Sequence, residues 1–224
     1  ESPYRSFFGF RDENGWPDNT SYEGWWDYDT LPKLNYEGSE ELYDYILGIA
    51  AKWVSAPYYV DGWRLDVAAD LGHSSEFNHK FWRDFRKAVK TANPEALILA
   101  EHYGDPKDWL EKGDQWDTVM NYDAFMEPLT WFLTGMEKHS DEYIPEKKGK
   151  VDDFEGAMRH FMASFQTSQL QCAMNELSNH DHSRFLTRTN GTAGRVETHG
   201  PEAAEYGVNF GIFREAVAVS YTHL

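Results

Sequence analysis

Short apolar segments alternate with amphipathic helical segments along most of this chain. The predicted strands cover residues 59–67, 96–100, 118–122 and 171–177, and the predicted helices cover residues 40–54, 75–91, 106–112, 129–138, 154–168 and 208 onward. Strands that alternate with helices are typical of parallel sheets with right-handed crossover connections. The alternation therefore restricts the fold to the α/β class, either as an open doubly wound sheet or as a barrel.

Polar side chains mark the carboxyl ends of the predicted strands. They are Asp66, Glu101, Asn121 and Asp181. In a (β/α)₈ barrel these ends converge on one mouth, where catalytic residues come from several strands. In an open sheet they would spread along an edge. The polar strand ends therefore favour a barrel. Because four strands make only half of one, the expected fold is a partial (β/α)₈ TIM barrel.

The first predicted strand carries a cation and a carboxylate two residues apart. Because side chains alternate along a strand, Arg64 and Asp66 point to one face and Leu65 points to the other. A cation beside a carboxylate favours its ionised form and fixes its direction, which a nucleophile requires. Taken alone, the pair is equally compatible with a structural ion pair and with a catalytic one.

The composition excludes some classes of partner. The formal net charge of −17 argues against nucleic acid, because phosphate binding needs a basic surface. No apolar run approaches the roughly 20 residues of a membrane-spanning helix. Nine Trp, 13 Tyr and 14 Phe favour a neutral ligand with flat apolar faces, such as a sugar, although most of these rings will pack in a core. The single Cys172 excludes an internal disulfide and a cysteine-rich zinc site, and it leaves the compartment open.

Three acids at three strand ends suit the cleavage of a glycosidic bond. One carboxylate can attack the anomeric carbon, a second can protonate the leaving oxygen, and a third can offset the positive charge that develops on the ring. Residues 61–66 (DGWRLD), 99–101 (LAE) and 178–181 (SNHD) resemble the fourth-, fifth- and seventh-strand motifs of the α-amylase family of glycoside hydrolases. Residues 31–35 (LPKLN) are similar to a motif of neopullulanases, cyclomaltodextrinases and maltogenic amylases.

The resemblance implies a role for each matching residue. Asp66 would be the nucleophile, Glu101 the general acid/base and Asp181 the transition-state stabiliser. Arg64 would hold Asp66, and His180 would bind hydroxyl groups of the sugar. The substrate-binding candidates are Arg64, Asp70, His102, Tyr122, Asn179 and His180. Trp25, Trp26 and Tyr122 are candidates either for stacking on sugar rings or for packing.

One position departs from the family's pattern. Asp70 stands where relatives often carry Lys-His or Asn-Glu, and this departure leaves the leaving-group subsite open. The resemblance implies retaining hydrolysis of α-glucosidic bonds in maltodextrins, cyclodextrins, pullulan or starch. It implies no metal and no cofactor, and the complete protein would be a candidate homodimer.

The two ends suggest a piece of a longer polypeptide. The family's third-strand motif, an Asp followed by Asn-His, has no counterpart, and neither does the eighth strand. We expect residues 1–38 to be the loop region before strand 4 and residues 39–224 to be the partial barrel, truncated in the helix after strand 7. The final residues, SYTHL, read as sequencing-adapter read-through.

Two alternatives stay open. The Asp, Glu, His and Asp side chains at the strand ends could ligate a divalent cation in a metal-dependent barrel hydrolase, and the run from His180 to His182 is the best argument for it, although Arg64 beside Asp66 would repel that cation. The isolated chain could also be a catalytically incomplete fragment with at most sugar binding, because half a barrel leaves apolar faces unburied.

Overall fold

The computed structural model describes residues 2–12, 14–15 and 21–222. The chain divides into two compact units: an amino-terminal unit, Glu1–Ile98 with Asp114–Trp116, and a carboxy-terminal unit, Leu99–Gly113 with Asp117–Leu224. The boundary predicted at residue 38 lies inside the amino-terminal unit. Across the described residues, every helix is too short or too polar to cross a bilayer.

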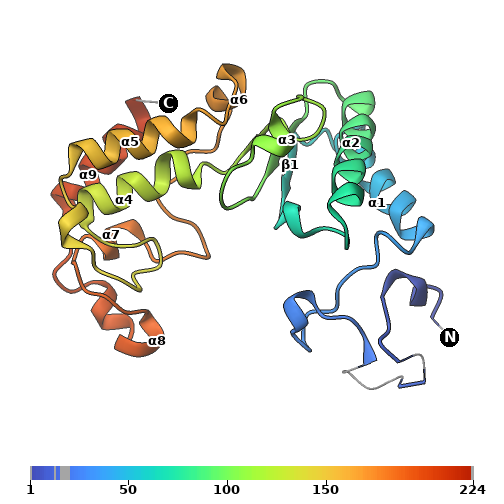
Figure 1. Ribbon diagram of the computed structural model, residues 1–224, viewed down its shortest axis with the longest axis horizontal. Helices are drawn as coiled ribbons and strands as arrows, with labels where there is room; N and C mark the ends of the chain where they lie inside the picture. Colours follow the sequence, from blue (N-terminus) through green and yellow to red (C-terminus); the bar gives the residue numbers. More distant parts are fainter. Residues whose placement is uncertain (1, 13, 16–20, 223–224) are drawn as a thin grey trace. The chain divides into compact units, whose positions relative to one another are not determined.

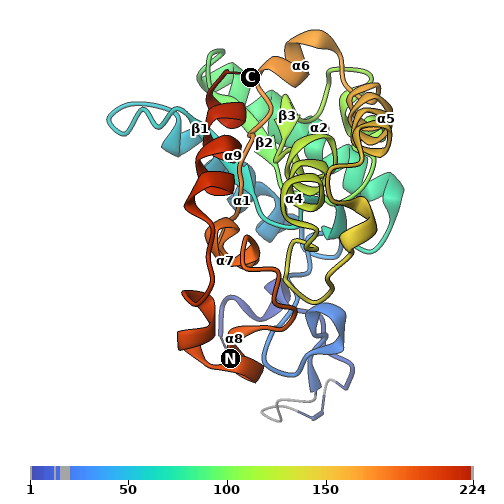
Figure 2. The same ribbon diagram turned by 90° about the vertical axis from the view of Figure 1, so that its left-hand side faces the viewer.

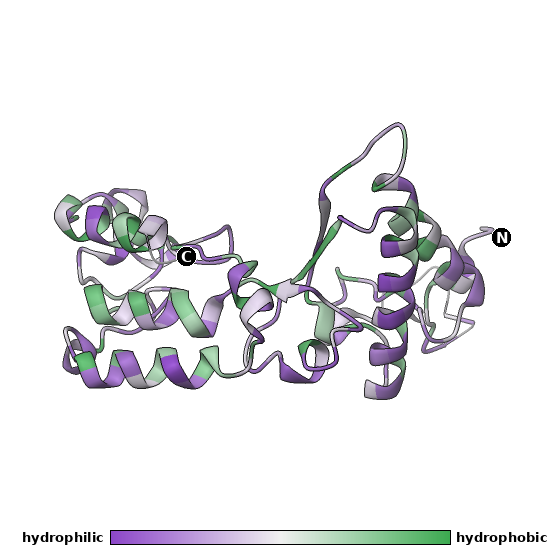
Figure 3. Ribbon diagram, turned by 90° about the horizontal axis from the view of Figure 1, so that it is seen from above, coloured by the Kyte–Doolittle hydropathy of each residue, from purple (hydrophilic) through white to green (hydrophobic). Residues whose placement is uncertain are grey.

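Two capped helices form the frame of the amino-terminal unit. Helix α1 spans Glu40–Trp53 and helix α2 spans Ser75–Ala92. The hydroxyl of Ser39 accepts a hydrogen bond from the Leu42 N–H, and Ser74 does the same for Phe77, so each helix has a side-chain N-cap. The two helices pack on each other, and both carry hydrophobic and hydrophilic residues side by side (Figures 1 and 3). Both predicted helices are confirmed.

Strand β1 is shorter than predicted. It covers Gly62–Leu65, with Leu65 buried and Arg64 exposed, as the alternation requires. Tyr59 and Val67 both have positive φ, 49° and 40°, so the chain leaves the extended conformation before and after the strand. Gly62 allows close approach of the neighbouring strand, because a Cβ there would lie 2.2 Å from the carbonyl oxygen of Leu97.

A buried amide fixes the turn that follows β1. The side chain of Asn78, on α2, donates to the carbonyl oxygens of Ala68, Ala69 and Leu71 at 3.0, 3.1 and 2.9 Å. The indole of Trp82 also donates to Ala68, at 2.9 Å. Because this turn holds the 3₁₀ segment Ala68–Asp70, helix α2 positions the residues directly after Asp66.

The sheet is parallel where the register is defined. Strand β2 covers Leu97–Ala100, strand β3 covers Thr118–Val119, and the strand order is β1-β2-β3. Leu99 pairs with Thr118 and Ala100 with Val119 in the carboxy-terminal unit. Helix α2 connects β1 to β2, so the predicted alternation is confirmed in this part of the chain.

The predicted fourth strand at 171–177 is reduced to a single bridge position. Helix α6, Thr167–Gln171, occupies its beginning, and one parallel bridge joins Met174 to Met120. The reason is a capping box at Gln166 and Gln169 that starts a helix. The buried Gln169 side chain also donates to the carbonyl oxygen of Leu110 at 2.7 Å, and this contact holds the helix in place.

Helices make up most of the carboxy-terminal unit. They are α3 Lys107–Leu110, a π-helical turn Tyr122–Met126, α4 Glu127–Thr134, α5 Val151–Met162, α7 Phe185–Arg188, α8 Val196–His199 and α9 Phe210–Thr222. The helix predicted at 129–138 ends early because Gly135 adopts φ 76°. The helix predicted at 154–168 begins and ends earlier, and α7 and α8 lie where the sequence predicts no helix. Helices α4, α5 and α9 lie side by side (Figures 1 and 2), and Phe125, Leu129, Phe185 and Ala216 form a core cluster there.

Replacing Asn78 should destabilise the turn after β1. Asn78→Leu leaves buried carbonyl groups without their amide donor, so the free energy of unfolding should fall by about 2–3 kcal/mol. Urea unfolding of the variant and of Arg83→Ala, an exposed position on the same helix, makes the comparison. Equal stabilities of the two variants would contradict the role of Asn78.

Candidate active site

The nucleophile candidate lies just beyond β1 and is paired with a cation. An Nη of Arg64 donates to Oδ1 of Asp66, and the Asp66 side chain is 75 % exposed. An ion pair this exposed adds little to stability. Its consequence is geometric, because the guanidinium fixes the direction of the carboxylate.

Asp70, the departure from the family pattern, has a defined partner. The indole N–H of Trp26 donates to Oδ2 of Asp70 at 2.9 Å. Trp26 itself stacks on Trp25, with ring centroids 4.3 Å apart. The structure thus brings together three of the predicted candidates within the amino-terminal unit.

A histidine that sequence reasoning missed anchors the loop with the LPKLN motif. Nε2 of His73 lies 2.8 Å from Oε2 of Glu23, and the backbone N–H of His73 donates to Oε2 of Glu37 at 2.8 Å. That N–H, with the Ser74 hydroxyl, holds the pKa of Glu37 below its usual value. Residues 23 and 37 flank the motif, so both of its ends are tied to the start of α2.

The acid/base candidate is buried in a hydrogen-bonded network. Glu101 follows β2 directly and is 4 % exposed. The hydroxyl of Tyr122 donates to Oε1 of Glu101 at 3.4 Å, and the amide of Asn179 donates to the Tyr122 oxygen at 2.9 Å. Asn179 also donates to Glu176 at 2.9 Å. Buried polar groups that bond to one another hold a single geometry, so Glu101 is oriented from within the carboxy-terminal unit.

Tyr122 does not present its ring for stacking on a sugar. The residue is 1 % exposed, and its ring stacks on Tyr103 with centroids 4.5 Å apart. Burial raises the pKa of Tyr122, and it raises the pKa of Tyr103 to about 12, so both phenols stay protonated. Of the two roles left open for Tyr122, the contacts are those of packing, because tertiary packing covers the ring and leaves the hydroxyl to face Glu101.

The stabiliser candidate lies in the loop after Leu177. The Asp181 side chain is 46 % exposed, and its backbone N–H donates to Oδ1 of Asn179 at 2.9 Å. His180 is 72 % exposed in its side chain, with Nε2 at 3.5 Å from Oδ2 of Asp181. Nδ1 of His139 lies 3.1 Å from the Asp181 carbonyl oxygen. The loop thus presents Asp181 and His180 to solvent while Asn179 points inward.

A buried arginine holds the two ends of this loop together. Arg188, on α7, donates to the carbonyl oxygens of Leu177 at 2.6 Å and Ser183 at 2.9 Å, and to the hydroxyl of Thr130 at 2.6 Å. Burial lowers the pKa of Arg188 to about 10, so the guanidinium remains charged at neutral pH. The residues between the two carbonyls are those of the SNHD motif and His182.

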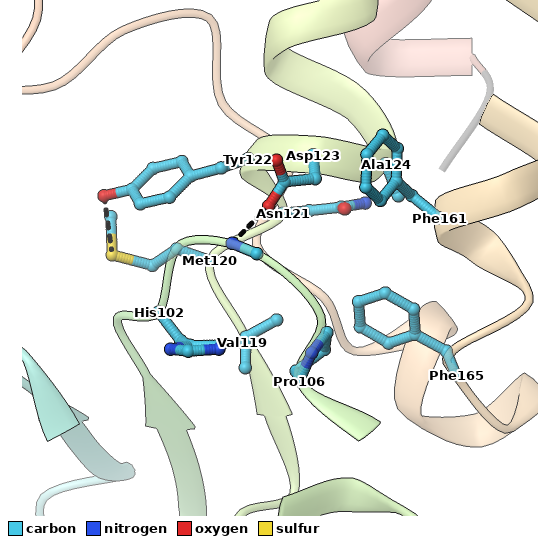
Figure 4. A pocket seen from close by; sticks show the side chains of 11 residues that line it. His102, Pro106, Val119, Met120, Asn121, Tyr122, Asp123, Ala124, Phe161 and Phe165 are labelled. Atoms are coloured by element: carbon cyan, nitrogen blue, oxygen red, sulfur yellow. Dashed lines mark hydrogen bonds between the residues drawn. The ribbon is translucent and has the colours of Figure 1, made fainter. Parts of the chain in front are cut away.

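His102 lines a hollow beside the acid/base candidate. The hollow encloses about 230 Å³, part of it open to solvent, and its wall includes Asn121, Asp123 and Phe161 (Figure 4). The backbone N–H of Gly104 donates to Oδ2 of Asp123 at 2.7 Å, and burial raises the pKa of that carboxyl. His102 lies 3.3 Å from the carbonyl oxygen of Asp105, with its ring against Trp109. In the described part of the chain, no group of three or more His, Cys, Asp or Glu side chains is placed to hold a metal ion.

His182 should remain uncharged in the folded protein well below neutral pH. Burial lowers the pKa of His182 from its usual value to about 3, and its Nε2 lies 3.1 Å from the Tyr103 hydroxyl. The unfolded chain binds the proton near pH 6.5, so stability falls as pH drops below that value and this loss ends near pH 3. In urea unfolding from about pH 7 to about pH 4, the wild type should lose up to about 1.4 kcal/mol per pH unit more than His182→Gln. The same pH dependence in both proteins would contradict a buried neutral His182.

Comparison with known sequences identifies related enzymes. The family described as "Alpha amylase, catalytic domain" matches residues 2–205. Neopullulanase 2 of Thermoactinomyces vulgaris is 32% identical over 209 residues, which cover 84% of this chain and 32% of that protein. A cyclomaltodextrinase of Thermoanaerobacter pseudethanolicus is 32% identical over 212 residues, which cover 85% of this chain and 33% of that protein. The chain spans about a third of the length of these curated relatives.

Solved structures agree with the sequence comparison. The debranching enzyme of Nostoc punctiforme has a TM-score of 0.71 at 28% identity, over 91% of this chain and 41% of that one. The cyclic α-maltosyl-(1→6)-maltose hydrolase of Arthrobacter globiformis has a TM-score of 0.67 at 27% identity, over 91% of this chain and 40% of that one. The predicted partial TIM barrel and the resemblance to neopullulanases and cyclomaltodextrinases are confirmed. The chain belongs to the α-amylase family, and residues 2–205 match its catalytic domain.

Proposed function

We propose that the protein to which this chain belongs hydrolyses α-glucosidic bonds of α-glucans with retention of configuration. The observation that carries the proposal is the buried Glu101, whose carboxyl group accepts a hydrogen bond from Tyr122. A buried, oriented carboxyl group suits the general acid of a glycosidase. The names of the relatives, neopullulanase and cyclomaltodextrinase, support α-glucans as the substrate class.

The reaction divides into two displacements. In the first, a carboxylate oxygen of Asp66 bonds to the anomeric carbon while the bond from that carbon to the leaving oxygen breaks and Glu101 gives the leaving oxygen its proton. In the second, Glu101 takes a proton from water, the water oxygen bonds to the anomeric carbon and Asp66 leaves. Asp181 offsets the positive charge on the ring in both transition states.

The remaining predicted residues act around these three acids. Arg64 holds the attacking carboxylate through the ion pair with Asp66. The exposed imidazole of His180 binds hydroxyl groups of the sugar ring being cleaved. Tyr122 and Asn179 do not touch the sugar in this proposal and instead orient Glu101.

The substrate is a neutral polymer or oligomer, which suits a chain with a net charge of −17. Maltodextrins, cyclodextrins, pullulan and starch all belong to this class. We propose that the reaction uses no metal, that neither nucleic acid nor a membrane is a partner, and that the complete protein forms a homodimer. Full turnover in excess EDTA would separate this mechanism from a metal-dependent hydrolase.

Removing the nucleophile should abolish turnover. The measurement should use the complete reading frame that encodes this chain, because the chain spans about a third of the length of its relatives. Asp66→Asn should lower kcat on maltodextrin on the order of 10⁴-fold or more, since no covalent intermediate can form. Asp44→Asn, an exposed position on α1, is the matched control.

Two results would contradict this assignment. One is an Asp66→Asn protein with the wild-type rate on maltodextrin. The other is a first-formed product of inverted configuration, which NMR of the anomeric proton shows directly.

Removing the Tyr122 hydroxyl should impair proton donation more than nucleophilic attack. For Tyr122→Phe, kcat/KM on maltotriose should fall about tenfold, because a hydrogen bond to the carboxyl group is lost. On α-maltosyl fluoride it should change far less, because fluoride leaves without a proton. Tyr43→Phe, which removes a hydroxyl that bonds to Asp84 instead, is the control. Equal losses on both substrates would assign Tyr122 a purely structural role.

A further inference from the structure

An exposed tryptophan is rigidly held in the loop before α1. The loop closes on itself through an antiparallel bridge between Gly24 and Pro32 and a hydrogen bond from the Trp25 N–H to the Leu31 carbonyl oxygen at 2.8 Å. Within it, Trp26 has φ 49° and ψ 34°, a left-handed conformation that bulky residues rarely adopt. Such a conformation persists only where the surrounding contacts impose it.

The two faces and the edge of the Trp26 indole have different surroundings. One face stacks on Trp25, with the rings 15° from parallel. The N–H at the edge donates to Asp70 at 2.9 Å. The residue nevertheless remains 68% exposed. The polar group of the ring is therefore satisfied and its position is fixed, while a large flat apolar surface faces solvent.

Asp70, which holds the Trp26 indole, lies in the same turn as the nucleophile candidate Asp66. Asp70 ends the 3₁₀ segment Ala68–Asp70, four residues after Asp66. Asn78 holds the backbone of that segment through three of its carbonyl groups. The position of Trp26 is thus coupled to the same turn that positions Asp66, all within the amino-terminal unit.

We propose that Trp26, supported by Trp25 and fixed by Asp70, is a stacking platform for a glucose ring of the α-glucan substrate. This inference rests on the proposed function and names a subsite for it. The apolar face of a pyranose ring covers the indole, which removes apolar surface from water. The second carboxylate oxygen of Asp70 then accepts from a ring hydroxyl.

The charges around the platform favour a neutral sugar. Asp70 accepts from the indole, Asp27 and Asp29 follow Trp26 in the same loop, and Arg11 pairs with Asp27 at 2.5 Å. Carboxylates at this density repel an anionic ligand. We therefore expect maltodextrins to bind at the platform and oligogalacturonates to bind far more weakly.

Calorimetric titration of the 224-residue chain with maltohexaose tests the platform without any turnover. Trp26→Ala should weaken binding roughly tenfold, and Trp26→Phe should retain most of it, since a flat ring remains. Asp70→Asn should bind nearly as well as the wild type, because the amide oxygen still accepts from the indole and the amide N–H can donate to the same ring hydroxyl, whereas Asp70→Leu should bind more weakly. Trp53→Ala, which removes another exposed tryptophan in the same unit, is the control.

Two outcomes would overturn the platform. The first is a wild-type chain that is folded by circular dichroism and does not bind maltohexaose. The second is equal binding of maltohexaose by Trp26→Ala and the wild type. If the chain alone is unfolded, the same titration of the complete protein in its Asp66→Asn form gives the answer. A complete protein that binds maltohexaose through Trp26 but never hydrolyses it would overturn the proposed function and leave the platform standing.

Discussion

The side-chain amide of Asn78 is the contact on which the amino-terminal unit most depends. Peptide carbonyl groups buried without a donor cost free energy, and a tight turn after a strand has no ladder to satisfy them. One amide on α2 supplies donors for three such carbonyls. The turn can therefore be short and fixed, and the strand end can project Asp66 into solvent while Asp70 reaches the indole of Trp26.

In the carboxy-terminal unit, the acid/base candidate Glu101 is buried rather than exposed. Glu101 lies under Tyr122, and Asn179 connects that phenol to the SNHD loop. Burial keeps the phenols of Tyr103 and Tyr122 protonated, so they serve as hydrogen-bond donors over the whole physiological pH range. The exposed Asp66 and the buried Glu101 thus rest on different kinds of support, one a backbone turn and the other a side-chain network.

Local sequence patterns predicted the parts of the fold that local forces determine. Helices α1 and α2 follow from their amphipathic pattern, and Asp66 and Glu101 follow from their places at the ends of apolar segments. Three features depend on contacts far apart in the chain and could not be read in this way. Gln169 is held by the Leu110 carbonyl group, Tyr103 covers the ring of Tyr122, and Trp26 bonds to Asp70 44 residues away. No periodicity encodes such pairs, because each partner is fixed by the fold as a whole.

Arg188 fixes the ends of the SNHD loop through the carbonyl groups of Leu177 and Ser183, rather than through the side chains between them. Both carbonyl groups that Arg188 holds lie outside residues 178–182, so the loop is closed whichever side chains stand between them. Substitutions inside the loop can change what it presents to a ligand without opening it. Asn179 inside the loop still connects it to Tyr122, whereas the ends of the loop depend on the buried guanidinium of Arg188. A lysine could not replace it, because one ammonium cannot reproduce the planar fork that reaches Leu177, Ser183 and Thr130 together.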